Sequence, residues 1–323
     1  MKAIRFETTG GPEVLQVVDL PTPTPGPGQV LVRHEAVGVN FIDTYHRSGL
    51  YPLKLPSGLG MEAAGVVEAL GEGVTRFRVG DTVAYASGPM GAYAEYNTPA
   101  AARTILLPPG VNARTGAAAL LKGMTAEFLL RRCYPVQAGE TILIHAAAGG
   151  VGSIAVQWAK HLGARVIATA GSEAKADRAR ALGADHVILY RDQDVAAEVR
   201  RLTDGKGVPV AYDSVGAATF EGTLGSLARR GLFVSFGNAS GPVPPFAPLR
   251  LSQAGSLFFT RPTMGDYQTT TEELDASAAA LFEVIASGAV KIEIGQTFPL
   301  AQARAAHEAL EGRETVGASL LIP

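Results

Sequence analysis

Residues Thr141–Gly152 read TILIHAAAGGVG and run directly into Ser153–Gly163, SIAVQWAKHLG. The short apolar run Ile142–Ile144 is typical of a buried parallel strand. A glycine-rich turn follows, and then apolar residues recur at helical spacing until Gly163, at Ile154, Ala155, Trp158, Ala159 and Leu162. The stretch therefore predicts a strand, a tight turn and a helix in direct succession.

In this context the glycines of the turn favour a dinucleotide-binding site. Gly149 would let the backbone approach a pyrophosphate, and Gly152 would let the helix pack close to the strand, while the helix N-terminus offers N–H groups to the phosphates. Ala147 stands where the GxGxxG pattern has its first glycine, and a turn of this kind can also be purely structural. A second predicted strand at Arg165–Thr169 closes a βαβ unit and favours the dinucleotide interpretation.

The composition is that of a globular chain. Its 323 residues, 47% hydrophobic and 18% charged, allow one large domain or two ordinary ones. The net charge of -2 gives no electrostatic basis for a nucleic acid or an anionic membrane as partner. The single cysteine, Cys133, excludes an intrachain disulfide and is expected to be a small packed side chain. Without a signal-peptide core or a long apolar run, we expect a soluble, cytoplasmic protein.

The pattern of predicted elements changes along the chain. Short strands separated by turns predict a β-rich, barrel-like N-terminal region, at 1–6, 15–19, 30–36, 64–70, 81–86, 93–97 and 104–107. From about Gly123, strands at 142–144, 165–169, 186–190, 208–213, 232–236 and 256–260 alternate with helices, including 172–182, 195–202 and 219–227. This alternation predicts an α/β fold with a doubly wound parallel sheet.

The tail changes again, with amphipathic helices predicted at 272–287 and 301–310 and a strand at 318–322. We expect the tail to return to the N-terminal region. The predicted domains are therefore 1–124 as substrate domain, 125–263 as nucleotide-binding domain, and 264–323 as the segment that completes the first.

Several separate motifs, in order along the whole chain, resemble zinc-free NADPH:quinone oxidoreductases of the zeta-crystallin type, in the medium-chain dehydrogenase/reductase superfamily. They are VGVNFIDTYHRSGLY (37–51), LPSGLGMEAAGVVEALGEGV (55–74), HAAAGGVG (145–152), YDSVG (212–216) and GASLLIP (317–323). The resemblance implies a GroES-like domain and a Rossmann domain with the active site in the cleft between them. It also implies a homodimer formed through an edge strand, which would be Ser256–Thr260.

The resemblance also raises the question of zinc. Zinc-dependent relatives have a cysteine where this chain has Asn40, a histidine where it has Met61, and a four-cysteine lobe that is missing here. Asp43, His46 and Glu62 are conceivable substitutes, but zinc needs three or four well-placed ligands. We therefore expect no metal, with Glu62 a buried paired carboxylate and His46 a polar loop residue.

A cofactor that itself performs the difficult chemical step suits such a site. The resemblance implies that the residues near the reacting groups are Asn40, Tyr45 and Tyr51. Asn40 can donate to a carbonyl or to the cofactor, and the tyrosines can stack on a flat ring or donate through O–H. The alternative is that both tyrosines are half-buried loop residues. His145 ends a buried strand, so we expect it to be a hydrogen-bonded core imidazole.

The predicted cofactor-binding residues lie on the glycine turn, after the other strands of the parallel sheet, and in the tail. Besides Asn40 they are Thr125, Phe128, Gly149, Gly150, Val151, Gly152, Gly171, Ser172, Lys175, Tyr190, Val215, Gly237, Asn238, Ala239, Ser240, Pro262, Thr263, Met264 and Arg313. Each of the loop residues could equally be an ordinary loop residue.

The end of the second strand indicates which nicotinamide cofactor is used. NAD-selective Rossmann domains place a carboxylate there to accept from the ribose 2′-OH. Here Gly171 and Ser172 follow the strand instead, and Glu173 comes only at the start of the next helix, so no carboxylate at the strand end repels a 2′-phosphate. In the quinone reductases that this chain resembles, residues matching Lys175, Tyr190 and Arg313 hold that phosphate. We therefore predict NADPH.

Two other functions remain open. Zinc-free members of the superfamily include reductases of enoyl and alkenal double bonds, for which Tyr45 or Tyr51 would be the proton donor. Zeta-crystallin relatives also serve as lens-structural proteins and bind AU-rich RNA, but a near-neutral chain without a basic stripe does not favour RNA. A small-molecule quinone is the expected substrate.

We expect Lys175→Ala to weaken NADPH binding by about 10- to 150-fold, because a charge-assisted contact to phosphate is worth roughly 1.5–3 kcal/mol. NADH binding should stay nearly unchanged. Titration of both cofactors against parent and variant measures this. Equal losses for the two cofactors, or a parent that prefers NADH, would contradict it.

Overall fold

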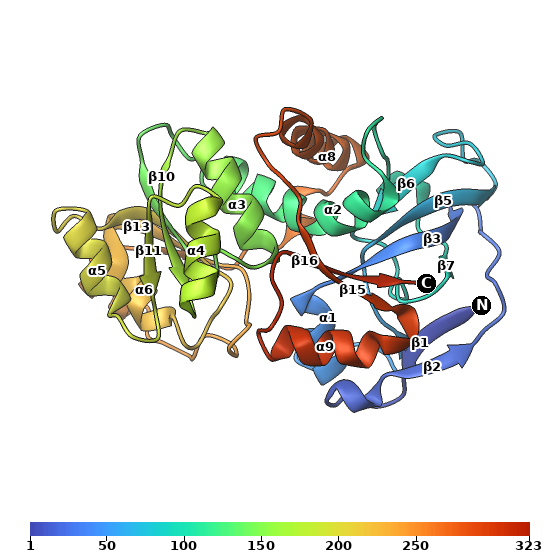
Figure 1. The fold of residues 1–323 in the computed structure, drawn as a ribbon, viewed down its shortest axis with the longest axis horizontal. Coiled ribbons are helices and arrows are strands. Elements are labelled where there is room, and N and C mark those ends of the chain that lie inside the picture. The colour runs from blue at the N-terminus through green and yellow to red at the C-terminus, as the bar shows by residue number, and fades with distance from the viewer. The chain divides into compact units, whose positions relative to one another are not determined.

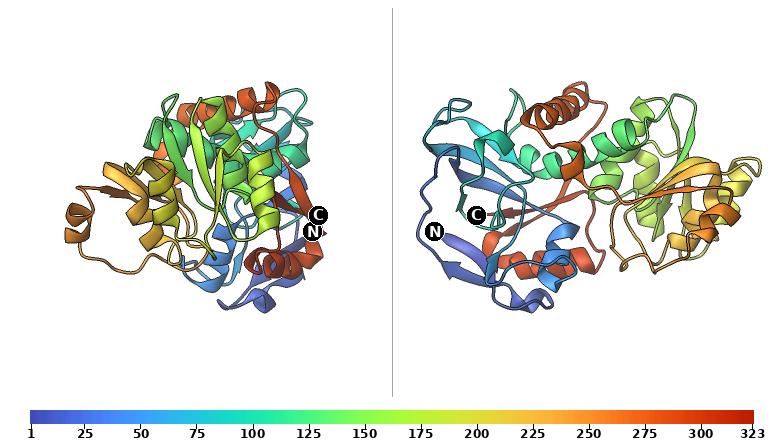
Figure 2. Two further views of the ribbon diagram at one scale, coloured as in Figure 1. Left: turned by 60° about the vertical axis from the view of Figure 1, so that its left-hand side comes forward. Right: turned by 180° about the vertical axis from the view of Figure 1, so that it is seen from behind.

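The computed structural model describes residues 1–323 and divides into two compact units. The first comprises Met1–Met124, Gln268–Ala286 and Ile292–Pro323, and the second comprises Thr125–Tyr267 and Ser287–Lys291. The first unit is therefore assembled from both ends of the chain, and both termini lie in it (Figures 1 and 2).

The second unit contains a six-stranded sheet in the order β11-β10-β9-β12-β13-β14, with every neighbouring pair parallel. The strands are β9 (Thr141–Ile144), β10 (Arg165–Ala170), β11 (His186–Leu189), β12 (Val208–Asp213), β13 (Leu227–Ser235) and β14 (Phe258–Thr260). The helices are α3 (Gly150–His161), α4 (Glu173–Ala181), α5 (Val195–Leu202), α6 (Phe220–Ser226) and α7 (Leu249–Gln253), and α5 packs on α6. The predicted doubly wound parallel sheet is confirmed.

This unit forms from its local patterns as expected. Fully buried apolar residues of the strands, such as Leu143, Ile167 and Phe233, belong to one core cluster. Gly163 and Gly183 follow α3 and α4 with φ of 85° and 104°, a left-handed conformation that favours glycine and ends a helix. Two details differ from the prediction: β13 begins earlier than expected, and α7 was not expected at all.

The strands of the first unit divide between two sheets instead of closing into one barrel. The smaller sheet has the order β2 (Gln16–Asp19), β1 (Lys2–Phe6), β4 (Ser57–Gly58). The seven-stranded sheet runs β15 (Ile294–Pro299), β16 (Ala318–Ile322), β3 (Val30–Val39), β5 (Ala63–Leu70), β6 (Thr82–Tyr85), β8 (Thr104–Leu106), and β7 (Tyr96–Asn97) pairs with β3. The tail enters this sheet through β16, which is antiparallel to β3 (Figure 2).

Two helices, α1 (Phe41–Ser48) and α2 (Ala113–Phe128), were missed by the sequence prediction, as was β15. Gly116 and Gly123 lie inside α2, where they allow other parts of the chain to pack closely against this helix. A Cβ at Gly123 would lie 2.3 Å from Leu281, and one at Gly116 would lie 2.7 Å from Leu107. The tail helices are α8 (Thr271–Ala286) and α9 (Ala303–Glu311). None of the helices is both long and apolar enough to span a bilayer.

One glutamine connects the segment 287–291 to the rest of the second unit. The side chain of Gln157, on α3, donates from Nε2 to the carbonyl of Lys291 (3.1 Å) and accepts at Oε1 from the Lys291 N–H (3.0 Å). The side-chain amide of Gln157 therefore makes the same pair of hydrogen bonds to Lys291 that a backbone peptide group of an adjacent strand would make. Nε2 also donates to the carbonyl of Ser153 (2.9 Å), so no polar atom of this side chain lacks a partner.

We expect Gln157→Leu to lower the free energy of unfolding by about 1–3 kcal/mol, because partly buried peptide groups lose their partners. Denaturant unfolding measures this. Gln137→Leu is the control, since the side chain of Gln137 makes only an exposed contact with Pro135 and should cost little. Equal costs for the two variants would contradict the prediction.

Candidate active site and dinucleotide site

The glycine turn leaves the N-terminus of α3 open. Gly149 is the residue before the helix, in an extended conformation with φ -81° and ψ 179°, and no side chain caps the helix. A Cβ at Gly149 would meet only the carbonyl oxygen of Ala146, at 3.2 Å. The first N–H groups of α3 can therefore receive an anion, and a phosphate could approach the backbone closely at this residue.

Gly152 has a different reason to be glycine. A Cβ there would lie 2.3 Å from the carbonyl oxygen of Ala146 and 2.9 Å from Cα of Ala147, so the first turn of α3 packs directly on the backbone that follows β9. The left-handed residue of this turn is Ala146, at φ 52°. Ala147 is buried without a positive φ and donates its N–H to Thr169, so the first position of the pattern does not require glycine here.

The predicted cofactor-binding residues of the second unit gather along one edge of its sheet. They follow the carboxyl ends of the parallel strands: Gly149–Gly152 after β9, Gly171 and Ser172 after β10, Tyr190 after β11, Val215 after β12, Gly237–Ser240 after β13, and Pro262–Met264 after β14. This is the edge at which open α/β sheets bind ligands. Lys175 lies near the start of α4.

The end of β10 offers no carboxylate. Ser172 precedes α4 without its hydroxyl capping that helix, and Glu173 pairs with Arg180 at 3.0 Å. A Cβ at Gly171 would lie 2.9 Å from the hydroxyl of Tyr190, so the tyrosine lies against this glycine. This arrangement fits a cofactor that carries a 2′-phosphate.

Other predicted residues of this unit hold the loops in place. The Ser240 hydroxyl donates to the carbonyl of Val215 (2.8 Å) and accepts from the N–H of Ala218 (3.0 Å), which joins the loops after β12 and β13. The Thr125 hydroxyl contacts the sulfur of Met264 at 4.0 Å. Phe128 stacks on Tyr267, with ring centroids 4.7 Å apart.

His145 is the hydrogen-bonded core imidazole that the sequence predicted. It is buried, and its ring nitrogens contact the hydroxyls of Thr169 (3.0 Å) and Thr223 (2.9 Å). Burial lowers the pKa of His145, so the ring is held neutral. Thr223 also donates to Asp213 (2.8 Å), whose other oxygen accepts from the N–H groups of Val215 (2.7 Å) and Gly216 (3.1 Å) and shapes the loop after β12.

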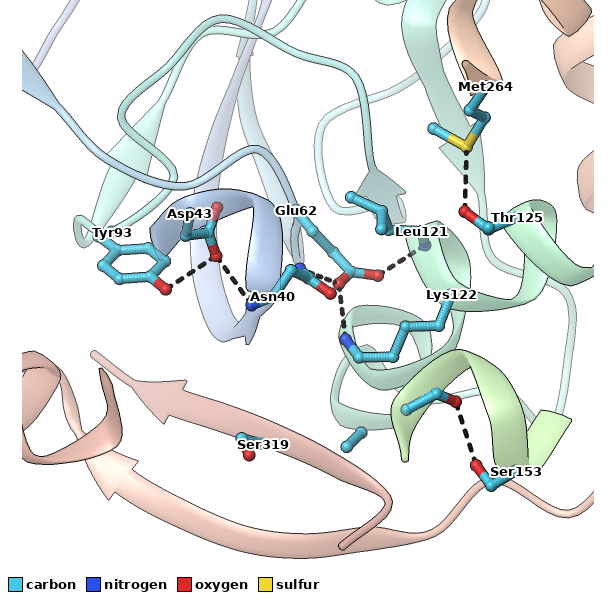
Figure 3. Close-up of polar contacts among 12 residues, drawn as sticks. Asn40, Asp43, Glu62, Tyr93, Leu121, Lys122, Thr125, Ser153, Met264 and Ser319 are labelled. Atoms are coloured by element: carbon cyan, nitrogen blue, oxygen red, sulfur yellow. Dashed lines mark hydrogen bonds and ion pairs between the residues drawn. The ribbon is translucent and has the colours of Figure 1, made fainter. Parts of the chain in front are cut away.

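In the first unit, Asn40 lies in a buried polar cluster at the start of α1 (Figure 3). Its side-chain amide donates to Oε2 of Glu62 (2.8 Å), which also faces the ammonium of Lys122 (3.1 Å). Oε1 of Glu62 accepts from the N–H of Leu121 (2.7 Å). Glu62 is fully buried, and these partners compensate its loss of hydration. The prediction of a buried, paired Glu62 is confirmed.

This donor set does not suit zinc. Glu62 is committed to Asn40, Lys122 and a backbone N–H, and Met61 offers no strong ligand. No three His, Cys, Asp or Glu side chains are grouped so that they could hold a metal ion. His46 is also not the loop residue that we expected, because it lies on α1.

A second set of buried residues extends from Asp43, on the first turn of α1. Its Oδ2 accepts from the N–H of Asn40 (2.8 Å) and from the hydroxyl of Tyr93 (2.9 Å) (Figure 3). Tyr93 also contacts Nε2 of His307 (3.0 Å), on α9, and Nδ1 of His307 faces Arg47 (2.9 Å). Arg47, on α1, pairs with Glu311 at 2.6 Å. Hydrogen bonds therefore connect α1 with α9.

Burial changes the pKa values of this set. Desolvation raises the pKa of Asp43 to about 7, although the hydrogen bonds from Asn40 and Tyr93 act against the shift. Desolvation, and then the charge of Arg47, lowers the pKa of His307 to about 3. Burial also raises the pKa of Tyr93 well above its usual value. Near neutral pH, therefore, Asp43 is the member of this set that exchanges a proton.

The two predicted tyrosines lie together. Tyr45 is buried on α1, and Tyr51 is half-buried just beyond that helix. Their rings meet edge to face with centroids 5.3 Å apart, and the N–H of Tyr51 donates to the carbonyl of Tyr45 (3.0 Å). Tyr45 is thus a helix residue, not a loop residue.

The predicted residue of the tail, Arg313, follows α9 in the first unit with φ of 58°.

Sequence reasoning missed the residues that hold Asn40. The spacing of Asn40 and Asp43 is that of a helix N-cap with a carboxylate three residues later, so α1 carried a signal that was overlooked. Lys122, Tyr93 and His307 carried no such local signal, because tertiary packing alone brings them to α1.

The fold and these sites define a two-unit, dinucleotide-binding dehydrogenase of the alcohol dehydrogenase type. Residues 26–129 match the family model of the alcohol dehydrogenase GroES-like domain, and residues 150–281 match that of the zinc-binding dehydrogenases.

The chain belongs to the quinone oxidoreductases of the medium-chain dehydrogenase/reductase superfamily. It is 54% identical to a quinone oxidoreductase of Pseudomonas aeruginosa, over 100% of this chain and 99% of that protein. The structure of Escherichia coli quinone oxidoreductase complexed with NADPH matches this one with a TM-score of 0.99, at 48% sequence identity and over 100% of both chains. A 2-haloacrylate reductase of a Burkholderia species is 44% identical, over 97% of this chain and 96% of that protein.

We expect Gly149→Val and Gly152→Val to separate binding from stability. A side chain at Gly149 would cover the open start of α3 and weaken NADPH binding. The same change should lower the free energy of unfolding by no more than about 1 kcal/mol. At Gly152 it would collide with the backbone of Ala146, and overpacking of this kind costs about 1–3 kcal/mol. Cofactor titration and denaturant unfolding measure the two effects. Undiminished NADPH binding by the Gly149 variant would mean that the turn is structural.

Proposed function

We propose that this protein catalyses the NADPH-dependent reduction of quinones without a metal. The observation that carries this proposal is end-to-end similarity to quinone oxidoreductases, one of which is known in complex with NADPH. The open start of α3 and the lack of a carboxylate after β10 support the choice of cofactor. Gly149–Gly152 would hold the pyrophosphate, and Ser172, Lys175 and Tyr190 would hold the 2′-phosphate.

NADPH, when bound, would supply a hydride to an electrophilic ring. The chain then needs to position the substrate more than it needs a strong acid, because solvent can protonate the reduced quinone. Tyr45 and Tyr51 offer an aromatic pair against which a flat ring could stack. Asn40 would contact the reacting groups, with its amide orientation set by Glu62, which can only accept while it is ionised.

The second candidate is reduction of an activated carbon–carbon double bond. The observation in its favour is the 44% identity to a 2-haloacrylate reductase over nearly the whole chain. The two functions share the hydride step and differ in the second one, because a carbon centre must receive a proton from a placed donor. The deciding experiment measures turnover of quinones, 2-haloacrylates, enones and alcohols with NADPH and with NADH. Turnover of haloacrylates or enones without quinones would reject the first proposal.

We also propose a cytoplasmic homodimer. The strand β14 is the free edge of the sheet, and Phe258 on this strand and Leu249 on α7 are large apolar side chains exposed by 62% and 64%. Size-exclusion chromatography with light scattering tests the dimer, and a monomeric mass would reject it.

For the roles of the domains, we propose that 1–124 together with 264–323 binds the quinone and that 125–263 binds NADPH.

We expect Tyr51→Phe to raise KM for quinones more than it lowers kcat, because the hydroxyl would orient the substrate while solvent supplies the protons. Steady-state kinetics with saturating NADPH measure both constants. Tyr134→Phe is a control, since its hydroxyl donates to Glu140 in the second unit. A thousandfold fall in kcat with unchanged cofactor affinity would make Tyr51 an obligatory acid and favour the double-bond reductase.

A further inference from the structure

The hydrogen bonds among Arg47, His307, Tyr93 and Asp43 all run in one direction. Arginine has no acceptor, so Nδ1 of His307 must be unprotonated where it faces Nη1 of Arg47. The neutral ring then carries its hydrogen on Nε2 and donates it to the Tyr93 oxygen. The hydroxyl hydrogen of Tyr93 is left to donate to Oδ2 of Asp43. The chemistry of the donors therefore makes Asp43 the acceptor at which this chain of bonds ends.

Asp43 is enclosed by ionisable groups from several elements, and it is fully buried. Tyr93 faces it directly, His307 lies behind Tyr93, and Arg47 lies one turn further along α1. Glu62 raises the pKa of Asp43, and Lys122 lowers it. Its second oxygen, Oδ1, is buried and accepts no hydrogen bond, so a proton can bind there without displacing a partner.

The state of Asp43 acts on Asn40. The N–H of Asn40 donates to Oδ2 of Asp43 at 2.8 Å, and this bond holds the backbone at the first residue before α1. The side-chain amide of Asn40 is held separately by Glu62. Hydrogen bonds to a charged acceptor are roughly twice as strong as those to a neutral one. A proton on Asp43 thus weakens one of the two bonds that hold Asn40 in place.

We propose that Asp43 is a positioning residue for Asn40, and that the uptake of one proton by Asp43 loosens Asn40 and slows quinone reduction. Tyr93 and His307 support this role, because His307 orients the hydroxyl of Tyr93 and that hydroxyl donates to Asp43, which favours the charged carboxylate. The inference rests on the proposed function for its kinetic part only.

The sign of the pH effect separates this role from a purely structural one. Burial raises the pKa of Asp43 from its usual 3.8 to about 7. The contribution of this group to stability is therefore complete below about pH 4 and is lost as the pH rises through about 7. Acidification from pH 8 to pH 6 thus stabilises the fold through Asp43. If Asp43 is a positioning residue, the same acidification reduces the rate.

The first experiment follows the backbone amide of Asn40 by NMR between pH 5.5 and 8.5, without substrate or cofactor. We expect its proton to shift with a single midpoint near the pKa of Asp43, and the shift to vanish in Asp43→Asn. The isosteric amide can still accept from Asn40 and Tyr93, and the fold already favours a neutral group there. An Asn40 amide that does not respond to pH, or that responds equally in Asp43→Asn, would overturn the inference.

The second experiment measures kcat/KM for a quinone over the same pH range. With a pKa of about 7 the parent should lose about tenfold between pH 8 and pH 6. Asp43→Asn should be slow and independent of pH, with the NADPH dissociation constant unchanged. An active parent without this loss at acid pH, or an Asp43→Asn variant at the parental rate, would reject the inference and leave the proposed function standing. A parent that reduces no quinone would reject the proposed function, and the Asn40 amide would still decide the coupling.

Tyr93→Phe is the second variant. It removes one donor to the carboxylate, so the midpoint of both titrations should move up by about one pH unit. Tyr85→Phe is the matched control, because Tyr85 is equally buried in the same unit but bonds to His34 and Asn97. A midpoint that does not move in Tyr93→Phe would contradict the role of Tyr93 in the chain.

Discussion

The second unit depends on the position of β9 between β10 and β12, with parallel pairing on both sides. The chain first builds outward through β10 and β11, then crosses to the other side of β9 for β12, β13 and β14. The order of strands reverses at β9, and this is where an open α/β sheet forms its binding crevice. The glycine turn comes directly after this strand. One topological constraint therefore places the uncapped N-terminus of α3 at the ligand-binding edge.

The first unit is governed by a different requirement, that buried charges and polar groups find partners. Glu62 and Asp43 are both fully buried, and each is provided with donors from more than one element. A lone carboxylate in such a place would be far too costly. Satisfying these two groups fixes α1 against α2 on one side and α9 on the other. The candidate residues Asn40 and Tyr45 owe their positions to that arrangement.

The comparison with quinone and 2-haloacrylate reductases shows how little of the scaffold separates two reactions. Identity is 54% to one relative over 100% of this chain and 44% to the other over 97% of it. The two proposed functions differ in whether a proton donor must stand beside the substrate, and Tyr45 and Tyr51 are the residues we propose for that place.

Local sequence patterns were sufficient to predict the parallel sheet. Apolar runs, glycine stops and helical periodicity are local, so β9 to β12 and α3 to α5 could be predicted almost to the residue. It also indicated a buried, paired Glu62 and a hydrogen-bonded core His145. Other features depend on packing between distant parts of the chain. The helix α2 was missed, and the glycines inside it, Gly116 and Gly123, are explained only by packing against Leu107 and Leu281. Tyr93 and His307 come to Asp43 from distant parts of the chain, so no local pattern could predict that this carboxylate would be buried and titrate near neutral pH.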